Sequence, residues 1–150
     1  MKPLPKSTDS PPSLQPVSAL VVEDNTDQWQ FIEFAFKHNS IPITPILATN
    51  AKQALRFLER CALTGTNFPR FILLDLYLPK REHGLAFLTE LRNKPEPLGL
   101  LPVVMLTASD QYEDMAASFE GGINGYIIKP LNPSDWLDCM VDLKQYWSPT

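Results

Sequence analysis

Short apolar runs alternate with amphipathic segments along most of the chain. Runs of four to six residues without polar alternation are typical of strands in a parallel sheet, because such strands are buried on both faces. The sequence predicts five of them, at residues 17–22, 43–48, 71–74, 102–106 and 125–128. Pro42 and Pro45 indicate that the second strand lies at an edge of the sheet, where a missing backbone donor is tolerated.

Each predicted strand is followed by a segment in which apolar residues recur every three or four positions, the spacing that gives a helix one buried face. Asn25 or Thr26 is the expected N-cap of the first helix, and Asn50 that of the second. The third helix is expected after Gly84, behind a charged loop at residues 80–83. The residues predicted to face the core are Trp29, Ile32, Ala35 and Phe36; Ala51, Ala54, Leu55 and Leu58; Leu85, Leu88 and Leu91; Met115, Ala116 and Phe119; and Trp136, Cys139, Met140, Leu143 and Trp147.

The fourth helix is expected at residues 110–120, before two glycines that would end it, and the fifth from Pro133. Strands that alternate with helices through short connections imply a parallel sheet with helices on both faces and right-handed crossovers. The sequence therefore predicts a doubly wound, five-stranded α/β fold with five helices over residues 17–147. Residues 1–16 are rich in Pro, Ser and Thr, which predicts a flexible tail.

The composition narrows the classes of partner. A net charge of −4 and the lack of any block of Lys or Arg argue against nucleic acid or an anionic membrane as a direct partner. Cys61 and Cys139 fall in apolar helical patterns, which favours buried reduced thiols over a disulfide or metal site. No run has the apolar length of a membrane span, and the start of the chain lacks the hydrophobic region of a signal peptide. The expected compartment is the cytoplasm.

Polar side chains stand at the ends of four predicted strands: Glu23 and Asp24 after the first, Asp75 after the third, Thr107 after the fourth and Lys129 after the fifth. Parallel strands all end at one edge of the sheet, so these residues are expected to meet. Three clustered carboxylates repel one another unless a cation lies among them, and carboxylate oxygens with water suit Mg²⁺. Magnesium, an ammonium group and a hydroxyl beside a carboxylate can all hold an incoming phosphoryl group. The set matches phosphorylation of a carboxylate.

Plainer interpretations exist for single residues. Asp75 and Thr107 could each be the N-cap of the following helix. Tyr126 could be an ordinary half-buried aromatic residue of a strand. A capping role for Thr107 does not explain why the small Ala108 and Lys129 accompany it.

Together these residues resemble the receiver domains of two-component response regulators, over nearly everything except the tail. The family pattern is an acidic pair after strand one, a phosphorylated Asp after strand three, Ser or Thr after strand four, and an aromatic residue three positions before a Lys-Pro pair. Here those positions are Glu23 and Asp24, Asp75, Thr107 followed by Ala108, Tyr126, and Lys129 with Pro130. The stretch that begins at Asp75 looks most like free-standing receivers paired with bacterial phytochrome-type kinases.

The resemblance implies a CheY-like, flavodoxin-like fold with strand order 2-1-3-4-5. It also implies that Asp75 accepts a phosphoryl group from the phosphohistidine of a sensor histidine kinase. Asp24 and Asp75 would bind Mg²⁺ directly, Glu23 would act mainly through water, and Tyr77 would add its main-chain carbonyl. The protein would catalyse only its own phosphorylation and dephosphorylation and would not be an enzyme for other substrates.

The resemblance further implies a conformational switch. Thr107 would move toward the acyl phosphate and Tyr126 would turn inward, which would bias the surface of the fourth helix, fifth strand and fifth helix between two states. Through that surface the protein would bind a downstream partner or form a homodimer. The bond between Lys129 and Pro130 is usually cis in this family.

Two features depart from the commonest family pattern. The segment between Asp75 and Gly84 is one residue longer than usual, which affects the loop near the metal. Tyr77 stands two residues after the phosphorylated position, where small or polar residues are common. We expect its ring to shield the acyl phosphate from water and to slow self-dephosphorylation.

Other classes of function fit less well. A pseudo-receiver, which docks partners without phosphoryl chemistry, would not need the retained acids, Thr107 and Lys129. A phosphatase of the haloacid dehalogenase type needs a second Asp where Tyr77 stands. Flavin or dinucleotide binding needs a glycine-rich or hydroxyl-rich phosphate cradle after the first strand, and acids occupy that loop.

Overall fold

The computed structural model describes residues 17–39 and 42–147, so the tail predicted at residues 1–16 lies outside the described residues. Five parallel strands form one sheet in the order β2-β1-β3-β4-β5, as expected. The strands are β1 (Ser18–Val22), β2 (Thr44–Ala48), β3 (Phe71–Leu74), β4 (Val103–Thr107) and β5 (Gly125–Ile128). The helices are α1 (Thr26–His38), α2 (Ala51–Thr64), α3 (Arg81–Arg92), α4 (Tyr112–Gly121), α5 (Trp136–Val141) and α6 (Lys144–Trp147), with short 3-10 turns η3 (Leu98–Leu100) and η4 (Pro133–Asp135).

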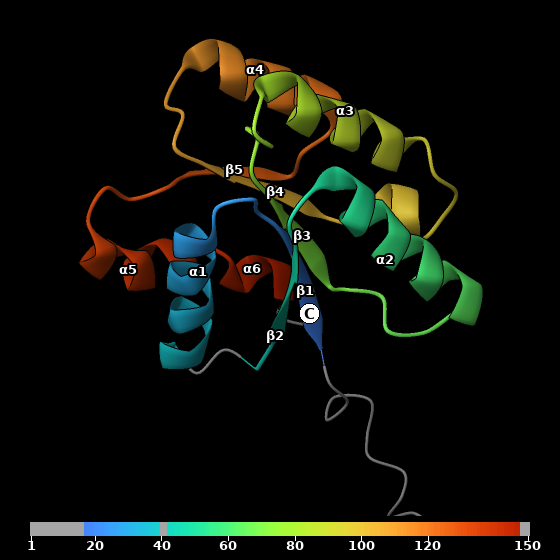
Figure 1. Cartoon of the computed structure of the whole chain (residues 1–150), viewed down its shortest axis with the longest axis horizontal. Coiled ribbons are helices and arrows are strands. Elements are labelled where there is room, and N and C mark those ends of the chain that lie inside the picture. The colour runs from blue at the N-terminus through green and yellow to red at the C-terminus, as the bar shows by residue number, and fades with distance from the viewer. Residues whose placement is uncertain (1–16, 40–41, 148–150) are drawn as a thin grey trace, which may run out of the picture.

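Helices cover both faces of the sheet. Figure 1 shows α1, α5 and α6 on one face and α2, α3 and α4 on the other. Alternate residues of the strands supply the two apolar cores, because neighbouring side chains of a strand point to opposite faces. In β3, Ile72 and Leu74 pack toward α2 and α3, whereas Phe71 and Leu73 pack toward α1 and α5. The sheet is thus buried on both faces, which is why its strands carry continuous apolar runs.

The predicted caps of the first two helices are confirmed. The side-chain oxygen of Asn25 accepts a hydrogen bond from the backbone of Gln28 at 3.0 Å, and that of Asn50 accepts one from the backbone of Gln53 at 2.8 Å. The glycine expected to end α4 is Gly122, whose φ of 108° lies in the left-handed region. Both cysteines carry free thiols, with Cys61 buried and Cys139 half-buried.

The predicted start of the third helix was wrong. Helix α3 begins at Arg81, so the segment expected to be a charged loop forms its first turn. Gly84 lies inside the helix because the helix passes very close to the segment after β3. A Cβ atom at Gly84 would clash with the carbonyl oxygen of Leu76. The glycine therefore reflects close packing of backbones and not a helix terminus.

The predicted inward face of the fourth helix was also wrong. Asp114 and Ser118 are its buried residues, whereas Ala116 is exposed and Phe119 is 48% exposed. The prediction assumed that the apolar residues of this helix face the core, and it therefore chose the neighbouring face. The physical reason is a set of polar partners around Asp114, described with the site below.

The last predicted helix is divided. A 3-10 turn at Pro133–Asp135 precedes α5, and a turn separates α5 from α6. The predicted inward residues Trp136, Met140 and Leu143 are buried, and the side chain of Trp147 lies outside the described part. No helix among residues 17–39 and 42–147 has the length and apolar character needed to cross a membrane.

Replacing Gly84 by Ala tests the close approach of α3 to Leu76. We expect a loss of about 2 kcal/mol in the free energy of unfolding, because the added methyl group overpacks against backbone. Urea denaturation measures this. Gly121→Ala is the matched control, since its Cβ would meet only the end of the Leu88 side chain, at 2.7 Å, and a side chain can rotate away. A cost at Gly84 no larger than that at Gly121 would contradict the proposed packing.

Candidate functional site

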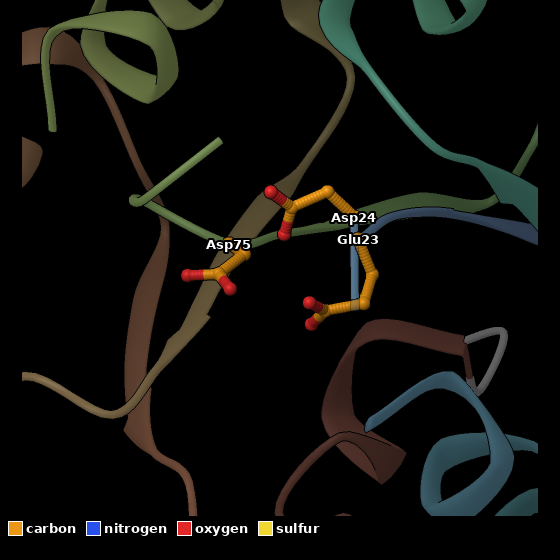
Figure 2. A group of neighbouring side chains, drawn as sticks. All are labelled: Glu23, Asp24 and Asp75. Atoms are coloured by element: carbon orange, nitrogen blue, oxygen red, sulfur yellow. The ribbon is translucent and has the colours of Figure 1, made fainter. Parts of the chain in front are cut away.

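Three carboxylates gather at the carboxyl edge of the sheet. Glu23 and Asp24 follow β1, and Asp75 follows β3, and Figure 2 shows the three side chains clustered there. One oxygen from each lies within 4.8 Å of the others. Glu23 and Asp75 are buried, at 2% and 8% exposure, whereas Asp24 is exposed. The predicted acidic cluster is therefore assembled, with one member open to water.

The ammonium group of Lys129 lies between two of these carboxylates. It donates to Oε1 of Glu23 at 2.8 Å and to Oδ2 of Asp75 at 2.8 Å. Lys129 is itself 8% exposed, and its backbone N–H donates to the carbonyl of Thr107 at 2.8 Å. The end of β5 is thereby held beside the end of β4, and the side chain reaches the acids from there.

The charges of this group are strongly linked. Burial raises the pKa of Glu23 to about 7, the charge of Asp75 adds to the increase, and Lys129 opposes it. Burial alone would lower the pKa of Lys129, but Asp75 and Glu23 outweigh burial and raise it. Lys129 therefore remains charged. Burial disfavours the ionised form of Glu23, and a further cation in the site would favour it.

Backbone donors fix the remaining carboxylate oxygens. Oδ1 of Asp75 accepts a hydrogen bond from the backbone of Tyr77 at 3.1 Å. Oε2 of Glu23 accepts one from the backbone of Asn25 at 3.1 Å. The segments after β1 and β3 therefore turn back on their own acids and hold them in place.

The donor set fits a hard divalent cation. Three carboxylates offer only oxygen ligands, and exposed Asp24 leaves room for the water molecules that Mg²⁺ usually keeps. Glu23, Asp24 and Asp75 are the residues whose oxygens come close enough to hold such a cation, and the main-chain carbonyl of Tyr77 stays a prediction as a further ligand. Buried Lys129 neutralises part of the charge of Glu23 and Asp75.

A pocket of about 340 Å³ opens beside Asp75. It is lined by Asp75, Tyr77, Thr107, Ala108, Ser109 and Lys129. Asp75, Thr107 and Lys129 are buried and form its inner part, whereas Tyr77 is 40% exposed and Ala108 is exposed. A carboxylate, a hydroxyl and an ammonium group thus face one space that has the room for a phosphoryl group.

Tyr126 does not line this pocket but is hydrogen-bonded to Ser109, which does. Its hydroxyl donates to the main-chain carbonyl of Ser109 at 2.9 Å, and the ring is half-buried against the core. The side chain thus points toward the segment after Thr107, and its role as a switch stays a prediction. The bond between Lys129 and Pro130 is trans, contrary to the expectation from the family; the cis bonds among the described residues are Leu78–Pro79 and Glu96–Pro97.

Sequence reasoning missed a second polar cluster next to the pocket. Asp114 of α4 accepts hydrogen bonds from the hydroxyl of Tyr77 at 2.9 Å and the hydroxyl of Ser109 at 2.5 Å. It also accepts one from Nε of Arg81 at 2.5 Å. The only signal in the sequence was a polar pair, Asp114 and Ser118, at helical spacing beside an apolar pair.

Comparison with known proteins identifies the family. Residues 19–140 match the response regulator receiver domain. The chain belongs to this family. Among curated relatives, the probable methanogenesis regulatory protein FilR2 of Methanothrix harundinacea is 33% identical, over 88% of this chain and 84% of its own length. Response regulator Rcp1 of Synechocystis is 31% identical, over 90% of this chain and 91% of its own length.

Solved receiver structures share the fold over nearly their whole length. The Mn²⁺-bound form of Rcp1 has a TM-score of 0.75 and 31% identity, covering 90% of this chain and 96% of its own. The phosphorylated cyanobacterial phytochrome response regulator RcpA has a TM-score of 0.76 and 28% identity, covering 89% and 94%. A divalent metal in Rcp1 and the acidic cluster of this receiver are consistent with a divalent metal site here.

Asp24→Asn tests the metal site. Magnesium at about 100 times its Kd should add about 2.7 kcal/mol to the free energy of unfolding, and a site tenfold weaker would retain about 1.4 kcal/mol. We expect the variant to lose about half of the gain while being at least as stable as the wild type without metal, because one repulsive charge is removed. Denaturation with and without Mg²⁺ measures both.

Asp27→Asn is the matched control, since Asp27 is an exposed acid in the first turn of α1. It should keep the full gain. Equal gains in the wild type and Asp24→Asn would show that Asp24 does not bind the metal.

Proposed function

We propose that this receiver accepts a phosphoryl group on Asp75 from a sensor histidine kinase and signals by phosphorylation-dependent protein binding. The observation that carries the proposal is the position of Asp75, which shares a buried ammonium group with Glu23 and borders a pocket that also contains Thr107. The pocket combines a nucleophilic carboxylate with the two donors that a bound phosphoryl group needs.

In the proposed transfer, a carboxylate oxygen of Asp75 attacks the phosphorus atom of the phosphohistidine. The phosphorus–nitrogen bond breaks, and its electron pair returns to the imidazole of the kinase. Lys129 holds one phosphoryl oxygen by charge, and the Thr107 hydroxyl donates to another. Bound Mg²⁺ would supply neutralisation of the charge on the transferred group.

The same contacts support a switch toward partner binding. Thr107 precedes Ser109 by two residues, and the carbonyl of Ser109 accepts the Tyr126 hydroxyl. Movement of Thr107 toward an acyl phosphate would therefore be transmitted to Tyr126 on β5. Exposed apolar side chains on α4, β5 and α5, namely Phe119, Ile128 and Val141, support a binding role for that surface.

The kinase that we propose is of the phytochrome type. Two bacteriophytochrome response regulators, RtBRR and AtBRR, share the fold with TM-scores of 0.71 and 0.69 and sequence identities of 31% and 28%. We also propose that the protein acts in the cytoplasm. It would hydrolyse no phosphate ester or anhydride other than its own acyl phosphate.

The first test is phosphorylation by a small donor. Incubation with phosphoramidate and Mg²⁺ should add one phosphoryl group to the wild type, and removal of Mg²⁺ should abolish the gain. Asp75→Asn keeps the size of the side chain but removes the nucleophile, so it should gain nothing. Intact-protein mass measures each case.

Asp138→Asn, at an exposed acid on α5, should gain the group normally. If the wild type is not phosphorylated under any condition, the chain is a pseudo-receiver that docks partners constitutively.

Phosphorylation should also promote dimerisation through α4, β5 and α5. Phe119→Glu should weaken the phosphorylation-dependent dimer at least about tenfold, the effect of about 1.4 kcal/mol, without altering phosphoryl uptake. Size-exclusion chromatography with light scattering reports the oligomer. Phe34→Glu is the matched control, because Phe34 of α1 is exposed to the same extent, 48%, on the other face of the sheet. An unchanged dimer in Phe119→Glu would rule out this surface.

A further inference from the structure

Two walls of the phosphoacceptor pocket share one hydrogen-bond acceptor. Tyr77 comes from the segment after β3, and Ser109 comes from the segment after β4, and both line the pocket. Their hydroxyl groups donate to the same oxygen, Oδ2 of Asp114, at 2.9 and 2.5 Å. The shared acceptor therefore bridges the two walls of the pocket.

The acceptor itself is held firmly. Asp114 is 4% exposed, and its second oxygen accepts from Nε of Arg81 at 2.5 Å. Burial raises the pKa of Asp114, but hydrogen bonds from Ser109, Arg81 and Tyr77 outweigh it and lower the pKa below its usual value. The carboxylate is thus ionised, and Arg81 balances its charge.

Helix α4 depends on this cluster for its orientation. No apolar side chain of α4, a helix described over its whole length, belongs to either apolar core. Its buried face is polar, and Asp114 stands in the first turn, where the helix dipole favours an anion. In Figure 1, α4 lies beside α3, the helix that carries Arg81.

We propose that Asp114 is a positioning residue that holds Tyr77 and Ser109 across the solvent side of the pocket and thereby prolongs the life of the acyl phosphate. The inference rests on the proposed function of Asp75. Asp114 does not line the pocket and acts only through the residues that it binds.

The step that it slows is hydrolysis. The oxygen of a water molecule attacks phosphorus, the bond between phosphorus and the Asp75 oxygen breaks, and the electron pair returns to the carboxylate. The water loses a proton to solvent, and inorganic phosphate leaves. In-line attack needs a water molecule on the side of phosphorus away from Asp75. Water enters through the open part of the pocket, which Tyr77, 40% exposed, and half-buried Ser109 line.

The experiment measures loss of the phosphoryl group after the donor is removed, with Mg²⁺ present, by intact-protein mass. Asp114→Asn keeps the shape of the side chain but loses the charge and one acceptor oxygen. Tyr77→Phe keeps the ring and loses only the hydroxyl. Each should shorten the lifetime about tenfold, equivalent to about 1.4 kcal/mol in the barrier. The double variant should be no faster than Asp114→Asn alone, because that change already releases the Tyr77 hydroxyl.

Three further variants separate positioning from stability. Ser109→Ala should shorten the lifetime, whereas Ser109→Thr retains the hydroxyl and should restore it. Glu113→Gln removes a neighbouring exposed charge from the same turn of α4 and should leave the lifetime unchanged. If Asp114→Asn folds poorly, Tyr77→Phe tests the same hydrogen bond from its exposed end.

The outcomes are distinct. A wild type that takes up no phosphoryl group overturns the proposed function and this inference with it. Normal uptake with an unchanged lifetime in both Asp114→Asn and Tyr77→Phe overturns the inference alone. The inference would also be overturned if the effects of Asp114→Asn and Tyr77→Phe on the lifetime add in the double variant. Additive effects would mean that the two residues act independently and not through one contact.

Discussion

The buried contact of Lys129 with Glu23 and Asp75 is the interaction on which the site depends. Two carboxylates and one ammonium group lie away from water, and removing one partner of such a group commonly costs about 3–5 kcal/mol, because a buried charge is left unpaired. The contact joins residues that lie 54 and 106 positions apart in the chain. It can form only if β1, β3 and β5 end at the same edge of one sheet. The parallel sheet is therefore a precondition for the charged cluster.

This dependence explains why much of the molecule could be predicted from its sequence. Uninterrupted apolar runs indicated buried parallel strands, and each strand carried its polar residue directly at its end, so the topology alone brought Asp24, Asp75 and Thr107 together. Gly84 was misleading because a glycine that precedes a helix and one that allows backbones to touch look the same in a sequence. The split before α6 was missed because the apolar spacing of the last helix continues across the turn.

The Asp114 cluster could not be predicted for a different reason. Its members come from the segment after β3, the start of α3, the segment after β4 and the first turn of α4. Their meeting depends on how α4 is rotated about its axis, and an apolar pattern predicts that rotation only where apolar contacts decide it. In α4 polar contacts decide it. A buried acid with three donors outweighs the modest gain from turning Met115 and Phe119 inward.

The two charged clusters lie on different sides of the pocket. Lys129 closes the inner side of the pocket and Asp114 fixes the outer side, and the segment from Thr107 to Ser109 runs between them. A group bound at Asp75 would draw Thr107 inward, while Asp114 holds Ser109, two residues later, against α4. Any displacement of this segment must then either break the hydrogen bond to Asp114 or move α4. No apolar side chain of α4 belongs to either apolar core, so a shift of the helix would change polar contacts but would disturb the packing of neither core. The same polar contacts that were invisible in the sequence thus make α4 the element best placed to report the state of the pocket.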